Sequence, residues 1–317
     1  MLAALGNVLS IVLAIGLGYA LAKRGWFKGE SAAVIPRLVV GVALPAYMVS
    51  TLLGGYDAAK LVALLPGLLL PAVTLVATYG IGRALAALLR MSPGRRGTFS
   101  SMFALSNAIF VGLPVNLVLF GDKSLPYVLL YYMANTTLFW TIGVYGIARD
   151  GAAVRHEARP PFFTRGSLRR IFSPPLVAFL AAIALILVGI KLPGFIMDFC
   201  RILGSMTTPL SMLFVGIVLS GVAWKTIRLD RDILLVFAGR FLVAPGLLLL
   251  IAVPSPLPLL MKEVLFVQAA MPAMTQTPIL AARYGADAEF AGLGTALTTV
   301  LSLVTIPLCK VVAGAVL

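Results

Sequence analysis

Prolines with polar neighbours interrupt two apolar stretches of the sequence, and each interruption could bind a ligand. The stretches read SSMFALSNAIFVGLPVNLVLFG over residues 100–121 and VLFVQAAMPAMTQTPILAARYG over residues 264–285. A proline inside a helix removes one backbone hydrogen bond and clashes with the preceding turn. In lipid, the freed carbonyl groups need another partner. We therefore predict two interrupted membrane helices, broken at Gly112-Leu113-Pro114 and between Pro272 and Pro278.

Such breaks present helix N-termini to a cavity near the middle of the membrane, and their partial positive charge suits an anion. A proline that only kinks a packed helix is the alternative interpretation. The residues that we expect to line the site are Asn107, Gly112, Leu113, Pro114, Pro272, Thr275, Gln276, Thr277 and Pro278, with Asn135 and Thr136 of the next span and Pro45, Pro209 and Arg240 of other spans. The amides of Asn107 and Gln276 are costly to leave unpaired in hydrocarbon.

Arg240 is the charged residue that lies inside an apolar span, in LLVFAGRFLVAPG. Its side chain could extend to the cytoplasmic headgroups. Alternatively, it could attract an anionic substrate or bond the carbonyl groups of a broken helix. No Asp or Glu lies in the middle of a span, so we expect no buried carboxylate and no carboxylate proton relay. Sodium bound by neutral side-chain and carbonyl oxygens stays possible.

The composition places these residues in a membrane protein. Of 317 residues, 61% are apolar and only 11% are charged, and the mean hydropathy is +1.04. A soluble domain carries about a quarter charged residues, so a soluble enzyme, a disordered chain and a disulfide-stapled module are excluded. We predict ten transmembrane helices, each long enough for a tilted crossing. Their ranges are 2–22, 32–53, 61–89, 98–120, 125–148, 174–192, 196–223, 232–252, 260–284 and 288–316.

A shift of 164 positions aligns the two halves of the chain. It superimposes Pro45 on Pro209 and Pro114 on Pro278. An odd number of spans in each half predicts two inverted repeats, an architecture common in secondary transporters. The expected fold is therefore an all-α membrane protein with ten helices in two inverted five-helix repeats, in which helices 4 and 9 are broken. The repeats are residues 1–148 and 174–317, and a basic loop, residues 149–173, joins them.

Most Lys and Arg residues lie in the loops after spans 1, 3, 5, 7 and 9. Basic loops stay cytoplasmic, so we expect both termini outside, loop 149–173 in the cytoplasm and the protein in a bacterial inner membrane. The basic residues flank apolar spans, so we expect lipid and no nucleic acid as a partner. A lone histidine, His156, and two cysteines without metal spacing predict no metal site, and we expect no cofactor. No ATP-binding motif occurs.

The chain resembles the auxin efflux carrier family, which includes plant PIN-type auxin exporters and bacterial permeases for malate and malonate. The resembling pieces are ALP at Ala43–Pro45, N-x-x-x-x-G-L-P at Asn107–Pro114, Met271-Pro272 with Pro278, A-x-x-Y-G-x-D at Ala281–Asp287 and LVTIP at Leu303–Pro307. The resemblance implies carboxylate binding by Asn107 and, as the nearest span-5 candidates, Asn135 and Thr136. It also implies a scaffold of spans 1, 2, 6 and 7, often dimeric, beside a moving transport domain.

The expected function is export of a small organic anion by alternating access, without covalent catalysis, driven by the membrane potential and the substrate gradient. A sodium-coupled organic-anion symporter of the bile-acid type is the first alternative. A membrane receptor that retains a transport fold is the second.

Overall fold

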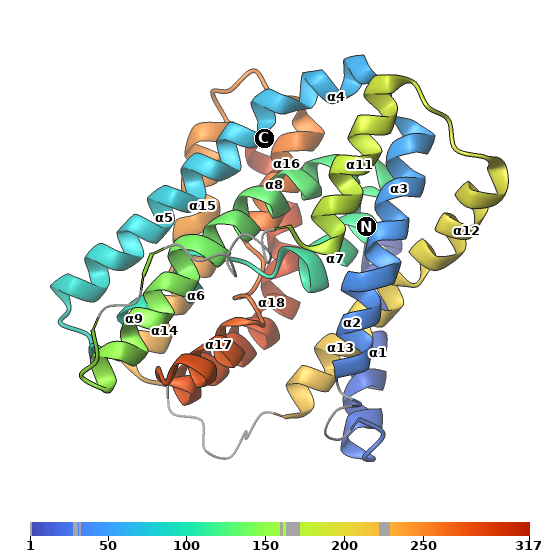
Figure 1. Cartoon of the computed structure of the whole chain (residues 1–317). Helices are drawn as coiled ribbons and strands as arrows, with labels where there is room; N and C mark the ends of the chain where they lie inside the picture. Colours follow the sequence, from blue (N-terminus) through green and yellow to red (C-terminus); the bar gives the residue numbers. More distant parts are fainter. Residues whose placement is uncertain (1, 28–30, 32, 159–160, 163–171, 222–228) are drawn as a thin grey trace. The chain divides into compact units, whose positions relative to one another are not determined.

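The structure is a computed structural model that describes residues 2–27, 31, 33–158, 161–162, 172–221 and 229–317. Regular secondary structure in these residues is helical (Figure 1), and strand-like pairing is confined to an isolated antiparallel bridge between Ser106 and Ala273. The chain divides into two compact units. Unit 1 comprises residues 1–66, 109–127 and 169–221, and unit 2 comprises residues 67–108, 128–168 and 222–317. Each unit therefore draws on both halves of the sequence.

Unit 1 is built on the close packing of two apolar helices that carry glycines at their contact. Its elements are α1 (Leu2–Lys23), α2 (Val34–Leu38), the π-helical turn η2 (Val39–Ala43), α3 (Leu44–Gly55), α4 (Ala58–Leu64), α7 (Leu113–Phe120), η5 (Asp122–Ser124), α11 (Pro174–Val188), α12 (Gly194–Ser205) and α13 (Thr207–Ser220). Helix α1 packs along α13. A Cβ atom at Gly18 or Gly216 would lie on the backbone of the opposite helix, so glycine permits this approach.

Unit 2 surrounds the short helix α6 (Arg96–Ala104). Its other elements are α5 (Leu69–Leu88), most of α8 (Leu125–Leu138), η6 (Phe139–Gly143), α9 (Val144–Val154), α14 (Arg231–Ala238), η8 (Gly239–Val243), α15 (Ala244–Ala252), α16 (Leu259–Ala269), α17 (Thr277–Tyr284) and α18 (Ala288–Val316). Helices α5, α9, α14, α17 and α18 all contact α6. Phe99, Met102 and Phe103 of α6 are fully buried in the core cluster that results.

Three prolines lie directly after π-helical turns and in the first turn of an α-helix. Pro45 follows η2, Pro245 follows η8, and Pro114 follows η4 (Ala108–Gly112). A π-turn moves the carbonyl group with which the proline ring would clash in a continuous α-helix. The prediction of a break at Gly112-Leu113-Pro114 is therefore wrong, because the helix continues through these residues. Regular helix is instead absent earlier, at residues 105–107.

Among the residues that the structure describes, five helical segments are long and apolar enough to cross a membrane: Val34–Gly55, Ala58–Leu88, Gly194–Ser220, Arg231–Ala252 and Ala288–Val316. Shorter apolar helices cover Val12–Lys23, Ala108–Phe120 and Pro174–Val188. The multi-pass, all-helical class is thereby confirmed. The count of ten spans, their inversion and the orientation of the termini stay predictions.

The contact between α6 and α9 generates a test. A Cβ atom at Gly97 would lie on the backbone of Gly146, whereas one at Gly80, on α5, meets no atom within 4 Å. We expect Gly97→Ala to lower the free energy of unfolding by about 1–3 kcal/mol, because two backbones must separate. Gly80→Ala is the matched control and should be neutral or slightly stabilising.

Thermal unfolding of the purified chain in detergent measures both variants. Equal melting temperatures for the two variants would contradict the direct backbone contact between α6 and α9.

Candidate functional site

Two non-helical stretches of unit 2, residues 105–107 and 270–276, pair with each other. Together they are called the interruption below. Helix α6 ends at Ala104 and η4 begins at Ala108, whereas α16 ends at Ala269 and α17 begins at Thr277. Between these ends, Ser106 forms an antiparallel bridge with Ala273, and the Asn107 N–H donates to the Pro272 carbonyl at 2.8 Å. Buried backbone groups must be paired. The two stretches therefore satisfy part of each other's hydrogen bonding.

Side chains from two further helices complete this pairing. Asn135 of α8 accepts from the Ser106 N–H through Oδ1 at 2.9 Å and donates through Nδ2 to the Ser106 carbonyl at 2.8 Å. On the other side, the Ala273 N–H donates to Oγ1 of Thr298 on α18 at 3.2 Å. The Asn135 amide thus takes the place of a neighbouring strand. Its observed role is to hold the backbone of the interruption.

Arg240 joins the C-terminal ends of the two helices that stop at the interruption. Its Nη1 donates to the Ala104 carbonyl at 2.6 Å, and its Nη2 donates to the Ala269 carbonyl at 2.6 Å. Nε and Nη2 both donate to the Met271 carbonyl, at 3.0 and 2.8 Å. The side chain is fully buried. The interpretation that it extends to the headgroups is wrong, because unpaired carbonyl groups at helix C-termini attract a cation more strongly.

The expected site residues divide between the two units. Asn107, Asn135 and Arg240 meet at the interruption in unit 2, where Thr136 and Thr275 are buried. Pro272 and Gln276 lie in the stretch between α16 and α17, and Thr277 and Pro278 begin α17. Gly112, Leu113 and Pro114 are buried in unit 1. Pro45 is half-buried and Pro209 is exposed in the same unit.

Several buried polar oxygens near the interruption have no hydrogen-bond partner in the described part of the chain. They include Gln268 Oε1, Gln276 Oε1 and Thr277 Oγ1, and Thr136 Oγ1, next in sequence to Asn135, has no partner either. Gln268 Nε2 donates to the Ala108 carbonyl at 3.3 Å, which orients its amide. Buried polar atoms usually have a partner, and those without one are candidates for ligand contacts. Sequence reasoning missed Gln268, although it lies four residues before Pro272 in an apolar helix.

Comparisons with known proteins identify the family. A family model described as membrane transport protein matches residues 3–309. The chain belongs to this family. The resemblance to auxin efflux carriers, which form this family, is thereby confirmed. Two archaeal relatives, both named uncharacterized transporters, are 26% identical: one from Methanocaldococcus jannaschii (over 95% of this chain and 96% of the relative) and one from Methanothermobacter thermautotrophicus (96% and 97%).

The transporter contains a buried carboxylate that the sequence analysis did not expect. Asp150 of α9 is 3% exposed and accepts hydrogen bonds from the N–H groups of Gly97 and Thr98 at 2.8 and 2.7 Å. It also accepts from Thr98 Oγ1 at 2.9 Å. Asp150 thus caps the N-terminus of α6 from a neighbouring helix. It escaped notice because it lies two residues beyond the predicted span 125–148.

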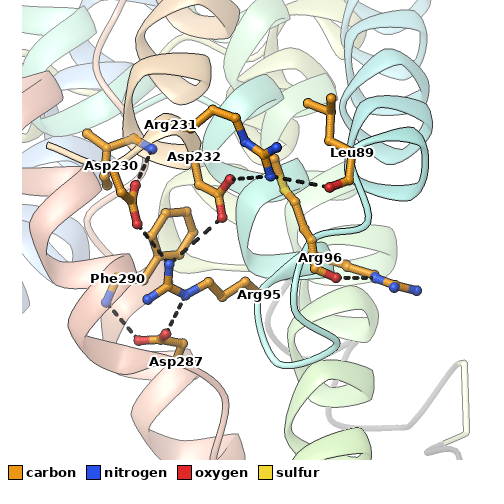
Figure 2. A network of polar contacts seen from close by, with 10 residues as sticks. Leu89, Arg95, Arg96, Asp230, Arg231, Asp232, Asp287 and Phe290 are labelled. Atoms are coloured by element: carbon orange, nitrogen blue, oxygen red, sulfur yellow. Dashed lines mark hydrogen bonds and ion pairs between the residues drawn. The ribbon is translucent and has the colours of Figure 1, made fainter.

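A charged cluster on the transporter joins three helix N-termini (Figure 2). Arg95, the N-cap residue of α6, bonds Asp287 through Nε at 2.6 Å and Asp230 through Nη1 at 2.9 Å. Asp230 caps α14 and Asp287 caps α18. The Arg95 guanidinium also lies over the Phe290 ring, 4.8 Å from its centre. This cluster holds the N-terminal ends of α6, α14 and α18 together, although Arg95, Asp230 and Asp287 lie in three different loops between the predicted spans.

The network around Arg240 predicts a specific instability. We expect Arg240→Lys to lower the free energy of unfolding of the transporter by at least about 2 kcal/mol, because a lysine cannot reach three carbonyl groups at once and an orphaned buried group costs about 1–3 kcal/mol. Arg231→Lys, at an exposed position that begins the same helix, should change it by less than about 0.5 kcal/mol. Chemical denaturation in detergent measures both. Equal stability of the two variants would refute the structural role of Arg240.

Burial raises the pKa of Asp150 from its ordinary 3.8 to about 6, although the hydrogen bonds from Gly97 and Thr98 oppose the rise. The folded state therefore holds this proton more tightly than the unfolded state, and stability falls as pH rises from about 4 to about 6. Asp150→Asn removes this titration. Its melting temperature should be lower than wild type at pH 4.5, and the difference should narrow by pH 7. Asp198→Asn, at an exposed position, should show the same dependence of melting temperature on pH as wild type. If Asp150→Asn also showed the wild-type dependence, the raised pKa could not belong to Asp150.

Proposed function

We propose that the protein is a secondary transporter that exports a small organic anion, such as a carboxylate, by alternating access and without covalent catalysis. The observation that carries this proposal is the asymmetry of charge at the interruption. Arg240 neutralises the C-terminal ends of α6 and α16. The N-terminal ends, at Ala108 and Thr277, keep their partial positive charge. An anion entering beside residues 105–107 and 270–276 would meet these ends and the buried guanidinium.

Helix boundaries support the proposal that helices 4 and 9 are equivalent broken crossings in two inverted repeats. Helices α7 and α17 each have 8 residues, each has proline as its second residue, and each ends at a glycine with positive φ. The glycines are Gly121, with φ of +70°, and Gly285, with φ of +71°. The shift of 164 positions superimposes these two helices end to end. Equal lengths, equal proline positions and a glycine with positive φ after each helix favour a duplication over chance.

Polar side chains near the interruption supply the proposed anion contacts. Asn107 and Gln276 contribute amide groups, and Thr136 and Thr277 contribute hydroxyl groups. Asn135, which already holds Ser106, acts chiefly by positioning. The driving force is the substrate gradient with the membrane potential, which is worth about 2.3 kcal/mol per charge per 100 mV. An inside-negative potential favours anion export.

The division into two units supports movement of one unit during transport. Unit 1 contains predicted spans 1, 2, 6 and 7 with the second half of span 4, and unit 2 contains most of the rest. We assign the scaffold to unit 1, with homodimerisation through spans 1, 2, 6 and 7, and the moving bundle to unit 2. The proposed location is the inner membrane of a bacterial cell, with both termini outside and loop 149–173 inside.

A sodium-coupled organic-anion symporter is the second candidate function. The unpartnered oxygens of Thr136, Gln268 and Thr277 favour it, because neutral oxygen ligands suit a hard cation. The two functions differ in one measurable property. The anion exporter responds to an imposed potential in sodium-free medium, whereas the symporter requires a sodium gradient.

Adjacent threonines in α8 provide a matched pair for the flux test. Thr136, which follows Asn135 in α8, is buried and Thr137 is exposed. In proteoliposomes loaded with labelled malate, malonate or indole-3-acetate, we expect Thr136→Ala to lower potential-driven efflux about tenfold, equivalent to about 1.4 kcal/mol. Thr137→Ala should retain the wild-type rate.

If the efflux rate from wild-type proteoliposomes did not change with the imposed potential, the proposal of an anion exporter would be contradicted. Sodium-dependent uptake, reduced by Gln268→Ala, would favour the symporter. Equal rates for Thr136→Ala and Thr137→Ala would remove Thr136 from the site.

A further inference from the structure

A cavity lies in unit 2 between residues of α5, α6 and α9, and none of the residues that line it belongs to the interruption. Its volume is about 280 Å³. It is lined by Arg83 in the second half of α5, Arg96 at the start of α6, Arg149 and Asp150 in the middle of α9, and Glu157 after the end of α9. Figure 1 shows these three helices side by side, and α6 contacts both α5 and α9. Three arginines thus line one small space.

The two carboxylates at this cavity form their hydrogen bonds and ion pairs with other groups, although the charge of Arg83 also acts on Asp150. Asp150 accepts three hydrogen bonds from Gly97 and Thr98 at the α6 N-terminus. Glu157 forms an ion pair with Arg155 at 2.8 Å. Within the described part of the chain, Arg83 and Arg149 make no hydrogen bond or ion pair with another side chain, and Arg96 donates through Nε to the Met91 carbonyl at 2.8 Å. The cavity therefore keeps an excess of positive charge with free donors.

We propose that this cavity binds a phosphate group through Arg83, Arg96 and Arg149. A guanidinium presents its donors as a planar fork that matches phosphate oxygens two at a time. Several such forks around one cavity can surround a phosphate on more than one side. A volume of 280 Å³ is at the lower end for ligand pockets, which suits a small head group better than a large organic molecule.

Exposed apolar side chains on α5 favour a phospholipid as the source of the phosphate. Arg83 lies on α5, whose outer face exposes Val73, Val76 and Leu88. An acyl chain can lie along such a face while its head group occupies the basic cavity. Basic pockets between membrane helices at the cytoplasmic surface bind anionic head groups in this way. Soluble phosphate shares the same chemistry and is the second arm of the test.

The proposal does not depend on transport of an anion at the interruption, because its readout is binding alone. In the first arm, the purified full chain is delipidated and reconstituted with phosphatidylglycerol or phosphatidylcholine, and retained lipid is counted by native mass spectrometry. In the second arm, equilibrium dialysis measures radiolabelled inorganic phosphate. The test variant is Arg83→Gln/Arg149→Gln. The matched control is Arg24→Gln/Arg283→Gln, which removes two exposed arginines elsewhere.

We expect wild type and the control to retain phosphatidylglycerol in preference to phosphatidylcholine, and the test variant to bind it at least tenfold more weakly. Phosphate bound in the dialysis arm without lipid selectivity would assign the cavity to a soluble phosphate. Hydrogen exchange of wild-type residues 149–157 should slow when the ligand binds, which tests the site without any substitution. Equal binding by the test and control variants, or unchanged exchange in this segment, would overturn the proposal.

Discussion

The arrangement of unit 2 depends on one buried guanidinium. Two helices, α6 and α16, stop inside the unit and leave carbonyl groups without helical partners. Arg240 donates four hydrogen bonds to three of these carbonyl groups and neutralises the negative ends of both helices. A cation buried without such partners would cost several kcal/mol. The interruption and the arginine therefore require each other, because neither is stable alone in an apolar surrounding.

Charged side chains stabilise several helix ends in unit 2. Helix α6 has 9 residues, too few to be stable alone in water, and both of its ends are held by charged side chains. Asp150 caps its N-terminus from α9, and Arg240 bonds its C-terminus from η8. Arg95 then connects the N-terminal end of α6 to the caps of α14 and α18 (Figure 2). Short helices packed around an interruption thus obtain from side chains the pairing that a long helix obtains from its own backbone.

In the proposed function, the same pairing also favours an anion at the interruption. If the C-terminal ends were not neutralised, their negative charge would cancel the attraction of the N-terminal ends. With Arg240 in place, the pocket that we propose keeps a positive field without a mobile cation at its surface. The chain belongs to the membrane transport protein family, and the anion contacts that we propose are uncharged groups, such as the Thr136 hydroxyl and the Gln276 amide.

Hydrophobicity and residue order alone determined the membrane class, the family and the stretch between Pro272 and Pro278 in which helix is absent. These features depend on local composition and on proline, whose effect on a helix is local. The position of the other non-helical stretch, residues 105–107, depends on contacts with residues that are distant in the sequence. Pro114 is accommodated by a π-turn, and residues 105–107 leave the helix where Asn135 and Pro272 can pair with them. Only the tertiary structure decided the roles of Arg240 and Asp150, because the sequence shows that a charge lies in or beside an apolar span but not which distant carbonyl or amide groups surround it.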